Sequence, residues 1–187
     1  MSKIDPDKPL PKITSREIVA KSGLFRVEGI DLEFSNGAKR RFERMAGSGR
    51  GAVMIIPFIN PETFLLVREY AAGTHSYQIG FPKGLIDPNE SPEQAAGREL
   101  QEEVGYAANS LTLLHSVGMA PTFFNSNMDI FIANDLYPSV LPGDEPEPLE
   151  VIEWSIHDIP ALLAREDFTE ARSIAGLLLA ERWLGNR

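Results

Sequence analysis

The N-terminal quarter of the chain carries short apolar runs broken by charged residues, a pattern typical of strands. We expect extended structure over residues 14–46, with Asn36-Gly37 forming a hairpin turn of type I′ between two strands. Residues 1–13 hold three prolines and many charges, so a loose arm is predicted there. The glycine-rich residues 47–51 are typical of a linker.

From residue 52 onward the pattern is that of a mixed α/β unit. Apolar runs of strand length occur at residues 53–58, 63–70, 111–117 and 128–133. A hairpin is expected at Asn60-Pro61, between the first two of these strands. Helical spacing near the C-terminus predicts a short helix near residues 158–165 and a longer one at about 169–184.

A further helix with well-marked ends is predicted in the middle of the chain. Ser91 is a good N-cap residue, and Gln94 three residues later completes a capping box. Gly105 can supply the left-handed residue at which helices commonly stop. We therefore expect a helix over residues 92–104, packed on a sheet through an apolar stripe in which Gly97 allows close approach.

Three carboxylates, Glu99, Glu102 and Glu103, fall on a different face of this helix, within an arc of roughly 100°. One interpretation is a solvated acidic face on which Arg98 pairs with Glu102. Against it, the like charges of Glu99 and Glu103 cost roughly 0.2–0.5 kcal/mol. The helix dipole also disfavours anions in the last turns, by roughly 0.3–1 kcal/mol each. Clustered hard oxygen ligands suit Mg²⁺ or Mn²⁺, whose charge would reverse the penalty.

The same stretch resembles the Nudix box, G-x5-E-x7-R-E-U-x-E-E-x-G-U, at every position. The match begins at Gly84, includes Glu90 and ends with the run from Arg98 to Tyr106, a common variant of the final apolar residue. Seven fixed residue types at fixed spacing should occur by chance on the order of one time in a million. The resemblance implies a hydrolase that cleaves a nucleoside diphosphate linked to another group.

The resemblance also implies the architecture. Nudix enzymes are α/β proteins, with an α/β/α sandwich around a mixed β-sheet and the box helix against that sheet. In the branch that hydrolyses ADP-ribose, an N-terminal strand-rich subdomain pairs with a second subunit, and residues 14–46 look like that element. The resemblance thus implies a homodimer. Residues 1–46 would be the N-terminal arm and dimerisation subdomain, and residues 47–187 the hydrolase domain.

Features outside the box favour the ADP-ribose pyrophosphatase branch. Pro121 lies sixteen residues after Gly105, an offset like that of a proline that marks this branch, although a simple turn after a strand is the alternative. Further segments resemble bacterial members, at residues 31–37, 68–70, 80–88, 136–138 and 143–148. They imply hydrolysis of ADP-ribose, NADH and diadenosine di- or triphosphate, with release of AMP. Gln78 stands where a glutamate is common, which leaves its role open.

By the same resemblance, the box residues have expected roles. Arg98 is expected to orient the carboxylates through Glu90 or Glu102, so that its role is structural and electrostatic. The expected ligands of Mg²⁺ or Mn²⁺ are Glu99, Glu102, Glu103 and the backbone carbonyl of Lys83. Such a cation would offset the negative charge of a pyrophosphate and lower the pKa of bound water.

The resemblance to the ADP-ribose branch implies a general base outside the box, on the acidic, proline-broken run of residues 142–148, here called the acidic loop. Within it Glu145 is the preferred base and Glu147 the second candidate. The alternative is that the acidic loop is only a solvated surface turn. These two readings have about equal support from the sequence, because proline-broken acidic loops are common on protein surfaces.

Four residues are candidates for binding the adenosine diphosphate part of a substrate. Arg68 and Arg44 are candidates to pair with phosphate, and Phe25 or Tyr70 is a candidate to stack on the base. The alternative is scaffolding, because exposed arginines and half-buried aromatic residues usually serve the fold.

Composition narrows the remaining possibilities. The 187 residues are 43% hydrophobic and 24% charged and include no cysteine, which excludes disulfides, thiolate metal sites and a cysteine nucleophile. The net charge of −9 argues against binding of long nucleic acids, while a small anionic substrate met through a metal stays compatible. No signal peptide and no apolar run of membrane-spanning length are seen, so a cytoplasmic protein is expected.

Two other functions remain open at this point. One is a pyrophosphohydrolase of nucleoside triphosphates or capped RNA, although the acidic charge counts against RNA. The other is a non-catalytic sensor that binds a nucleotide sugar and regulates a partner. Sensors of this kind typically lose box glutamates, whereas all four are present here.

Overall fold

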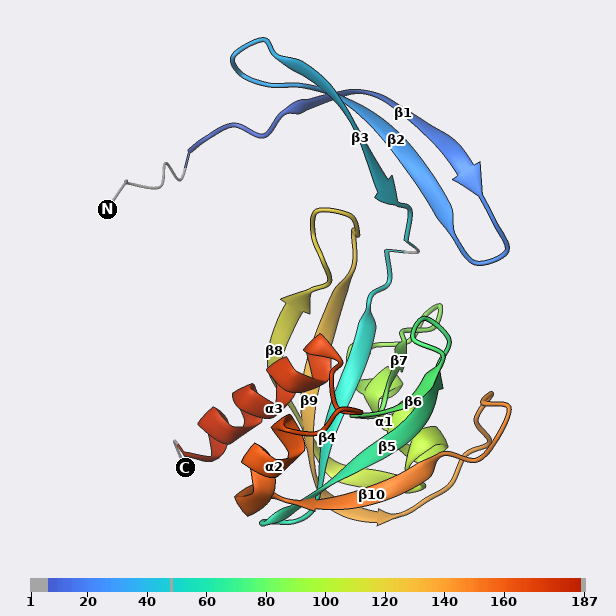
Figure 1. Cartoon of the computed structure of the whole chain (residues 1–187), viewed down its shortest axis with the longest axis vertical. Coiled ribbons are helices and arrows are strands. Elements are labelled where there is room, and N and C mark those ends of the chain that lie inside the picture. The colour runs from blue at the N-terminus through green and yellow to red at the C-terminus, as the bar shows by residue number, and fades with distance from the viewer. Residues whose placement is uncertain (1–6, 48, 186–187) are drawn as a thin grey trace. The chain divides into compact units, whose positions relative to one another are not determined.

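The computed structural model describes residues 7–47 and 49–185. The chain divides into two compact units (Figure 1). The first runs up to Gly49 and also includes Gly118–Ser126. The second comprises Arg50–Val117 and the chain from Asn127 onward. The segment 118–126 joins the first unit partly through a bridge between Met45 and Phe124.

The first unit is built on a three-stranded antiparallel sheet in the order β1-β2-β3. Its strands are β1 (Lys12–Lys21), β2 (Arg26–Glu33) and β3 (Lys39–Met45). The extended structure predicted for residues 14–46 is therefore confirmed. Every residue of β1 is exposed, and Phe25 and Phe42 are about half exposed as well. Within its own unit, this sheet thus leaves several apolar side chains uncovered.

The turn between β2 and β3 is not the predicted type I′ turn. Glu33 and Lys39 form the last strand pair, so that five residues connect the strands instead of two. In this turn only Gly37 has a positive φ, of 79°, whereas type I′ requires positive φ at both central residues. Asn36 instead accepts a hydrogen bond at its Oδ1 from the backbone N–H of Ala38 at 3.0 Å. This side-chain bond stabilises a longer connection.

The second unit contains a mixed sheet in the order β10-β5-β4-β9-β8, with β6 paired to β5 and β7 to β4. Its strands are β4 (Ala52–Asn60), β5 (Thr63–Ala71), β6 (Ser76–Gly80), β7 (Lys83–Leu85), β8 (Tyr106–Gly118), β9 (Asn127–Pro138) and β10 (Glu150–Ser155). β4 runs parallel to β9 and antiparallel to β5. The four predicted strands and the mixed sheet are confirmed, and β6, β7 and β10 were not predicted.

Helices cover both faces of this sheet (Figure 1). The helices are α1 (Pro92–Glu103), α2 (Ile159–Leu163) and α3 (Ala171–Leu184), with a 3₁₀ turn at Ile156–Asp158 before α2. Val53 and Ile55 of β4 belong to the core cluster that includes residues of α1. Met54 and Ile56, which alternate with them, approach Gly176 of α3. Because alternate residues of a strand face opposite ways, α1 and α3 lie on opposite faces, as an α/β/α sandwich requires.

None of the helices in the described ranges is long and apolar enough to cross a membrane.

Candidate active site

The ends of α1 are fixed by the residues that the sequence indicated. Ser91 accepts a hydrogen bond at its Oγ from the N–H of Gln94 at 3.2 Å, and Gln94 accepts one at its Oε1 from the N–H of Ser91 at 2.8 Å. Both halves of the capping box are therefore present. Val104 is the C-cap, and Gly105 follows it with a φ of 77°. The predicted helix is confirmed to within one residue at its C-terminal end.

The predicted apolar stripe of α1 is buried at Leu100 and Val104, and it is wrong only at Gly97. Ala95, Ala96 and Leu100 are fully buried in the core of the second unit. A Cβ added to Gly97 would meet no atom within 4 Å, so the predicted close approach at Gly97 is wrong. The helix rests on the sheet through its alanines, whose small side chains already permit close packing.

The glycine that does need to lack a side chain is Gly84, in β7. A Cβ at this position would overlap the carboxylate of Glu99. The Glu99 side chain therefore occupies the space beside the β7 backbone, and it is only 8% exposed. This contact explains why a glycine is required fifteen residues before the glutamate.

Arg98 holds several of the box carboxylates in place. Its Nε and Nη2 donate to the two carboxylate oxygens of Glu90, each at 3.0 Å. Its Nη1 donates to Glu99 at 2.6 Å and to Glu102 at 2.8 Å, and Nη2 also donates to the backbone oxygen of Leu85 at 2.9 Å. These bonds raise the pKa of Arg98 and lower the pKa of Glu90. The structure thus brings Arg98 together with both glutamates named as its partners.

Glu103 has a different environment. It is only 7% exposed, and its Oε2 accepts a hydrogen bond from the backbone N–H of Lys83 at 3.2 Å. Burial raises the pKa of Glu103 to about 8, against the lowering effect of the Lys83 charge and with a further rise from Glu99. Burial also raises the pKa of Glu99, despite its bond to Arg98. Both buried carboxylates are therefore poorly compensated in their charged forms.

Such a pair fits a divalent cation. Glu99 and Glu103 lie one helical turn apart, supply hard oxygen atoms, and would each be stabilised by a nearby positive charge. Glu102 pairs with Arg98, as Glu99 does, but its side chain is more exposed, at 21% against 10%. Within residues 7–47 and 49–185, no group of three Asp, Glu, His or Cys side chains is already gathered as a complete metal site. The donors that fit a cation best are thus Glu99 and Glu103.

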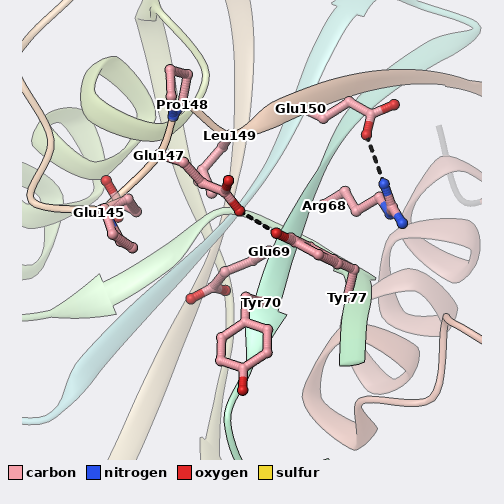
Figure 2. A pocket seen from close by; sticks show the side chains of 10 residues that line it. Arg68, Glu69, Tyr70, Tyr77, Glu145, Glu147, Pro148, Leu149 and Glu150 are labelled. Atoms are coloured by element: carbon pink, nitrogen blue, oxygen red, sulfur yellow. Dashed lines mark hydrogen bonds and ion pairs between the residues drawn. The ribbon is translucent and has the colours of Figure 1, made fainter. Parts of the chain in front are cut away.

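A pocket of about 410 Å³ lies in the same unit (Figure 2). It is lined by Arg68, Glu69, Tyr70, Tyr77 and residues 145–150. Arg68 donates from Nη1 to Glu150 at 3.1 Å, and its guanidinium lies 4.8 Å from the centre of the Tyr77 ring. Two of the predicted substrate residues, Arg68 and Tyr70, therefore meet the acidic loop in one pocket.

The two glutamates of the acidic loop are held differently. Glu147 accepts a hydrogen bond from the phenol of Tyr77, which raises the pKa of that phenol. Figure 2 shows Glu147 directed at Tyr77, with Glu145 standing apart from both. The charge of Glu145 contributes to the raised pKa of Glu99, so Glu145 is close enough to interact with the α1 carboxylates.

Comparisons with known proteins match both units of the chain. A model of the NUDIX domain matches residues 49–177, which is more than half of the chain. The chain belongs to the Nudix hydrolase family. A model described as the NudE-type Nudix hydrolase N-terminal domain matches residues 11–44. The predicted family and the predicted class of enzyme are confirmed.

Individual Nudix relatives agree with this assignment. The chain is 53% identical over 174 residues to the ADP compounds hydrolase NudE of Escherichia coli (strain K12), covering 93% of each protein. It is 28% identical over 171 residues to the ADP-ribose pyrophosphatase of Bacillus subtilis (strain 168), covering 87% of this chain and 90% of the relative. A crystal structure of an ADP compounds hydrolase superposes with a TM-score of 0.92 at 50% identity, covering 97% of this chain and 98% of that one.

Two residues of this Nudix site were missed from the sequence. The first is Glu69. It accepts a hydrogen bond from Nζ of Lys83 at 2.6 Å, and its charge helps to raise the pKa of Glu103. The other missed residue is Tyr77, which holds the acidic loop. Glu69 is the charged neighbour of Arg68 on a strand, which was a usable signal, whereas nothing local marks Tyr77.

Gln78, whose role was left open from the sequence, forms its described side-chain hydrogen bonds with Ser76 and Thr169. Its Nε2 donates to Ser76 at 2.9 Å, and its Oε1 accepts from Thr169 at 3.0 Å. Gln78 therefore links β6 to the segment before α3.

The other predicted substrate residues lie in the first unit. Arg44 is half-buried and donates from Nε to Glu28 at 2.8 Å, while Phe25 is 53% exposed. Arg44 and Pro121 line a pocket of about 250 Å³ together with Phe42. The structure thus brings Arg44 and Pro121 together and leaves Phe25 outside that pocket.

Proposed function

We propose that this Nudix hydrolase cleaves the pyrophosphate bond of ADP-linked compounds, namely ADP-ribose, NADH and diadenosine di- or triphosphate, and releases AMP. The observation that carries this proposal is the 53% identity to a bacterial ADP compounds hydrolase over 93% of both chains. The complete Nudix box, with all four glutamates and the arginine, supports a catalytic protein instead of a sensor.

Nudix hydrolases generally use divalent metal ions, and we propose Mg²⁺ or Mn²⁺ for this one. Glu99 and Glu103 would hold the cation, with the backbone carbonyl of Lys83. Glu102 would release Arg98 and bind the metal as a further ligand. When bound, the cation offsets the charge of the pyrophosphate oxygens and lowers the pKa of a water molecule. Arg98 keeps the carboxylates oriented through its bonds to Glu90.

We propose Glu145 as the general base. Its place over Gly143, near the C-terminal end of α1, supports this role, because a base must reach the water that attacks the phosphorus. Glu147, the second candidate, is engaged by Tyr77. Arg68 would release Glu150 and pair with a phosphate of the substrate, because the carboxylate and the phosphate are both anions.

Three other residues are proposed to bind the adenosine part of the substrate. Tyr70 lines the pocket that holds Arg68 and is 45% exposed, so its ring is available for stacking. Arg44 and Phe25, in the first unit, are proposed for the same moiety.

We also propose that the protein is a cytoplasmic homodimer, with residues 1–46 as the dimerisation subdomain and residues 47–187 as the hydrolase domain. The uncovered apolar residues of the first unit support this assignment. Ile18 is 54% exposed and Phe42 is 47% exposed, and a second subunit would bury such side chains.

The proposal is tested by incubating the purified protein with ADP-ribose, NADH and diadenosine triphosphate, each with Mg²⁺, with Mn²⁺ and with EDTA. We expect metal-dependent release of AMP, at rates above those of phosphate or pyrophosphate release from nucleoside triphosphates. Failure to release AMP from every ADP-linked compound contradicts the proposed function.

The base is tested separately, with Glu145→Gln. We expect a fall in kcat of roughly 10² to 10⁴-fold, because a positioned base contributes about that much. Glu153→Gln is the matched control, since Glu153 is exposed on β10 and does not line the pocket. Equal turnover of the two variants would contradict the assignment of Glu145.

A further inference from the structure

The acidic loop is tied to the protein at both ends. Before it, the backbone N–H of Leu141 donates to the carbonyl of Gln101 in α1 at 3.2 Å. After it, Glu150 begins β10, pairs in register with Arg68 of β5 and accepts a bond from its side chain. These anchors fix the two ends of the acidic loop but leave its middle to be placed by other contacts.

Tyr77 makes that middle contact. Its phenol donates to Glu147, which is the one side-chain hydrogen bond of residues 142–148 in the described structure. The Tyr77 ring is itself held between neighbours, with the Arg68 guanidinium 4.8 Å from its centre and the Tyr70 ring edge-on at 5.9 Å. The phenol is thus a fixed donor on β6.

The backbone around Glu147 is stiff. Pro146 and Pro148 enclose it, and each proline fixes its own φ. Glu145 and Glu147 both precede a proline, so both are restricted to extended conformations. Little rotational freedom is left between these two glutamates. A bond that fixes Glu147 therefore also limits where the Glu145 carboxylate can lie.

Glu145 lies on the α1 side of this segment. Its carboxylate folds over Gly143, where a Cβ would overlap it. That Cβ position is 3.7 Å from the backbone oxygen of Glu102, near the C-terminal end of α1. The charge of Glu145 is also felt by Glu99. Glu145 is therefore placed near the C-terminal end of α1, the helix that carries the proposed metal ligands.

We propose that Tyr77 is a positioning residue for hydrolysis. Its phenol holds Glu147, and the stiff backbone of residues 145–148 then restricts where the Glu145 carboxylate can lie. The inference rests on the proposed function, in which Glu145 is the base. The Tyr77 hydroxyl acts on the reaction through the acidic loop, whereas the ring packs against Arg68 and Tyr70. Glu147 is accordingly a partner of Tyr77 and not a second base.

The kinetic test compares Tyr77→Phe, Glu147→Ala and Glu147→Gln with wild type, using ADP-ribose. We expect Tyr77→Phe and Glu147→Ala each to lower kcat by roughly 10 to 100-fold, because misplacing a reacting group by about 1 Å costs up to that much. KM should change by less than about threefold, since uniform substrate binding is kept. Glu147→Gln keeps an acceptor oxygen for the phenol and should retain most of the turnover.

Double variants separate positioning from general damage. Tyr77→Phe with Glu147→Ala should be no slower than the slower single variant, because both remove the same bond. On the Glu145→Gln background, Tyr77→Phe should change kcat by less than about twofold, because no base remains to be placed. Tyr137→Phe, which removes an exposed phenol from β9, is the matched control and should leave kcat unchanged.

Two kinetic outcomes would overturn the proposal. One is wild-type kcat in Tyr77→Phe. The other is a loss of kcat in each double variant that equals the product of the two single losses. Such independent losses would mean that the two residues do not act together through Glu145.

NMR relaxation of the backbone amides gives a readout that does not depend on turnover. We expect lower order parameters for the amides of Gly143, Asp144, Glu145 and Glu147 in Tyr77→Phe than in wild type or Tyr137→Phe. Unchanged order parameters there would overturn the proposal, even if the protein hydrolyses none of the tested substrates. Absence of AMP release by wild type would instead contradict the proposed function, so the two failures are distinguishable.

Discussion

Glu103 and Glu170 are two carboxylates at the ends of helices on opposite faces of the same sheet. Glu103 is the last residue of α1, where the helix dipole disfavours an anion, and the described structure gives it no arginine partner. Glu170 is the N-cap of α3, where the dipole favours an anion. Its carboxylate accepts hydrogen bonds from the N–H groups of Arg172 and Ser173, at 3.1 and 2.8 Å, and pairs with the Arg172 side chain.

The pKa values of the two groups move in opposite directions. Burial raises the pKa of Glu103 to about 8. Burial acts in the same sense on Glu170, but the bonds from Arg172 and Ser173 outweigh it and lower the pKa. Glu170 therefore stabilises the fold as an anion, whereas Glu103 is costly as an anion until a cation arrives. A carboxylate that the fold leaves uncompensated is the one to test for function.

The largest effect is expected from Glu103→Gln. Removing a charged ligand should lower metal-dependent AMP release by several orders of magnitude, because the metal would lose one of its two buried carboxylates. Glu93→Gln, at an exposed position in the first turn of the same helix, is the control and should keep its turnover. Near-normal turnover of Glu103→Gln would mean that Glu103 is no more functional than Glu170.

Gly84→Ala should have the next largest effect. The new methyl group would overlap the Glu99 carboxylate and displace it from its place beside β7. We expect the Mg²⁺ concentration for half-maximal activity to rise by roughly 10 to 100-fold, as for other changes that disturb the orientation of a metal ligand. Gly97→Ala is the control from the same box, because a methyl group there meets open space. Equal metal requirements in both variants would show that Glu99 is not held by this contact.

Glu170→Ala should lower the stability of the protein and leave its turnover unchanged, the reverse of Glu103→Gln. Loss of an N-cap typically costs about 0.5–2 kcal/mol, so we expect a lower midpoint of denaturant unfolding with turnover of the folded protein retained. Glu181→Ala, an exposed position on α3, should leave the midpoint unchanged. A loss of turnover in Glu170→Ala beyond the loss of folded protein would remove the contrast with Glu103.

Local signals in the sequence predicted α1 well, because its caps and its periodicity all lie within residues 91–105. The burial of Glu99 and Glu103 was not predictable in the same way. It depends on Gly84 and Lys83 of β7, a strand of only three residues whose partner is β4. The periodicity of a helix does not reveal which element covers its polar face.

Non-local pairing explains the other misses. The bond between Tyr77 and Glu147 joins residues seventy positions apart, and β10 pairs with β5 across a similar interval. β10 has no fully buried residue, so its pattern does not stand out as a strand. Segment 118–126 joins the first unit although the sequence places it inside the second. Such contacts are set by the assembled sheet and not by neighbouring residues.

The smallest expected effect is the dependence of folding stability on pH in the absence of metal. Because the folded pKa of Glu103 is raised from its ordinary 4.5 to about 8, the stability that protonated Glu103 contributes should fall as pH rises through this window. Because the folded pKa of Glu170 is lowered, its contribution should be present above pH 4.5 and fall as pH decreases below that value.

Unfolding midpoints measured in EDTA from about pH 3 to about pH 8.5, which extends below the ordinary pKa of a glutamate, should therefore separate the two residues. Relative to wild type, Glu103→Gln should gain stability towards high pH, because it removes a buried charge. Glu170→Gln should lose stability at neutral pH and approach wild type in acid. If the unfolding midpoints of the two variants changed with pH in parallel, the opposite pKa directions would be contradicted. The distinction between Glu170, which stabilises the fold as an anion, and Glu103, which would need a cation, would then be lost.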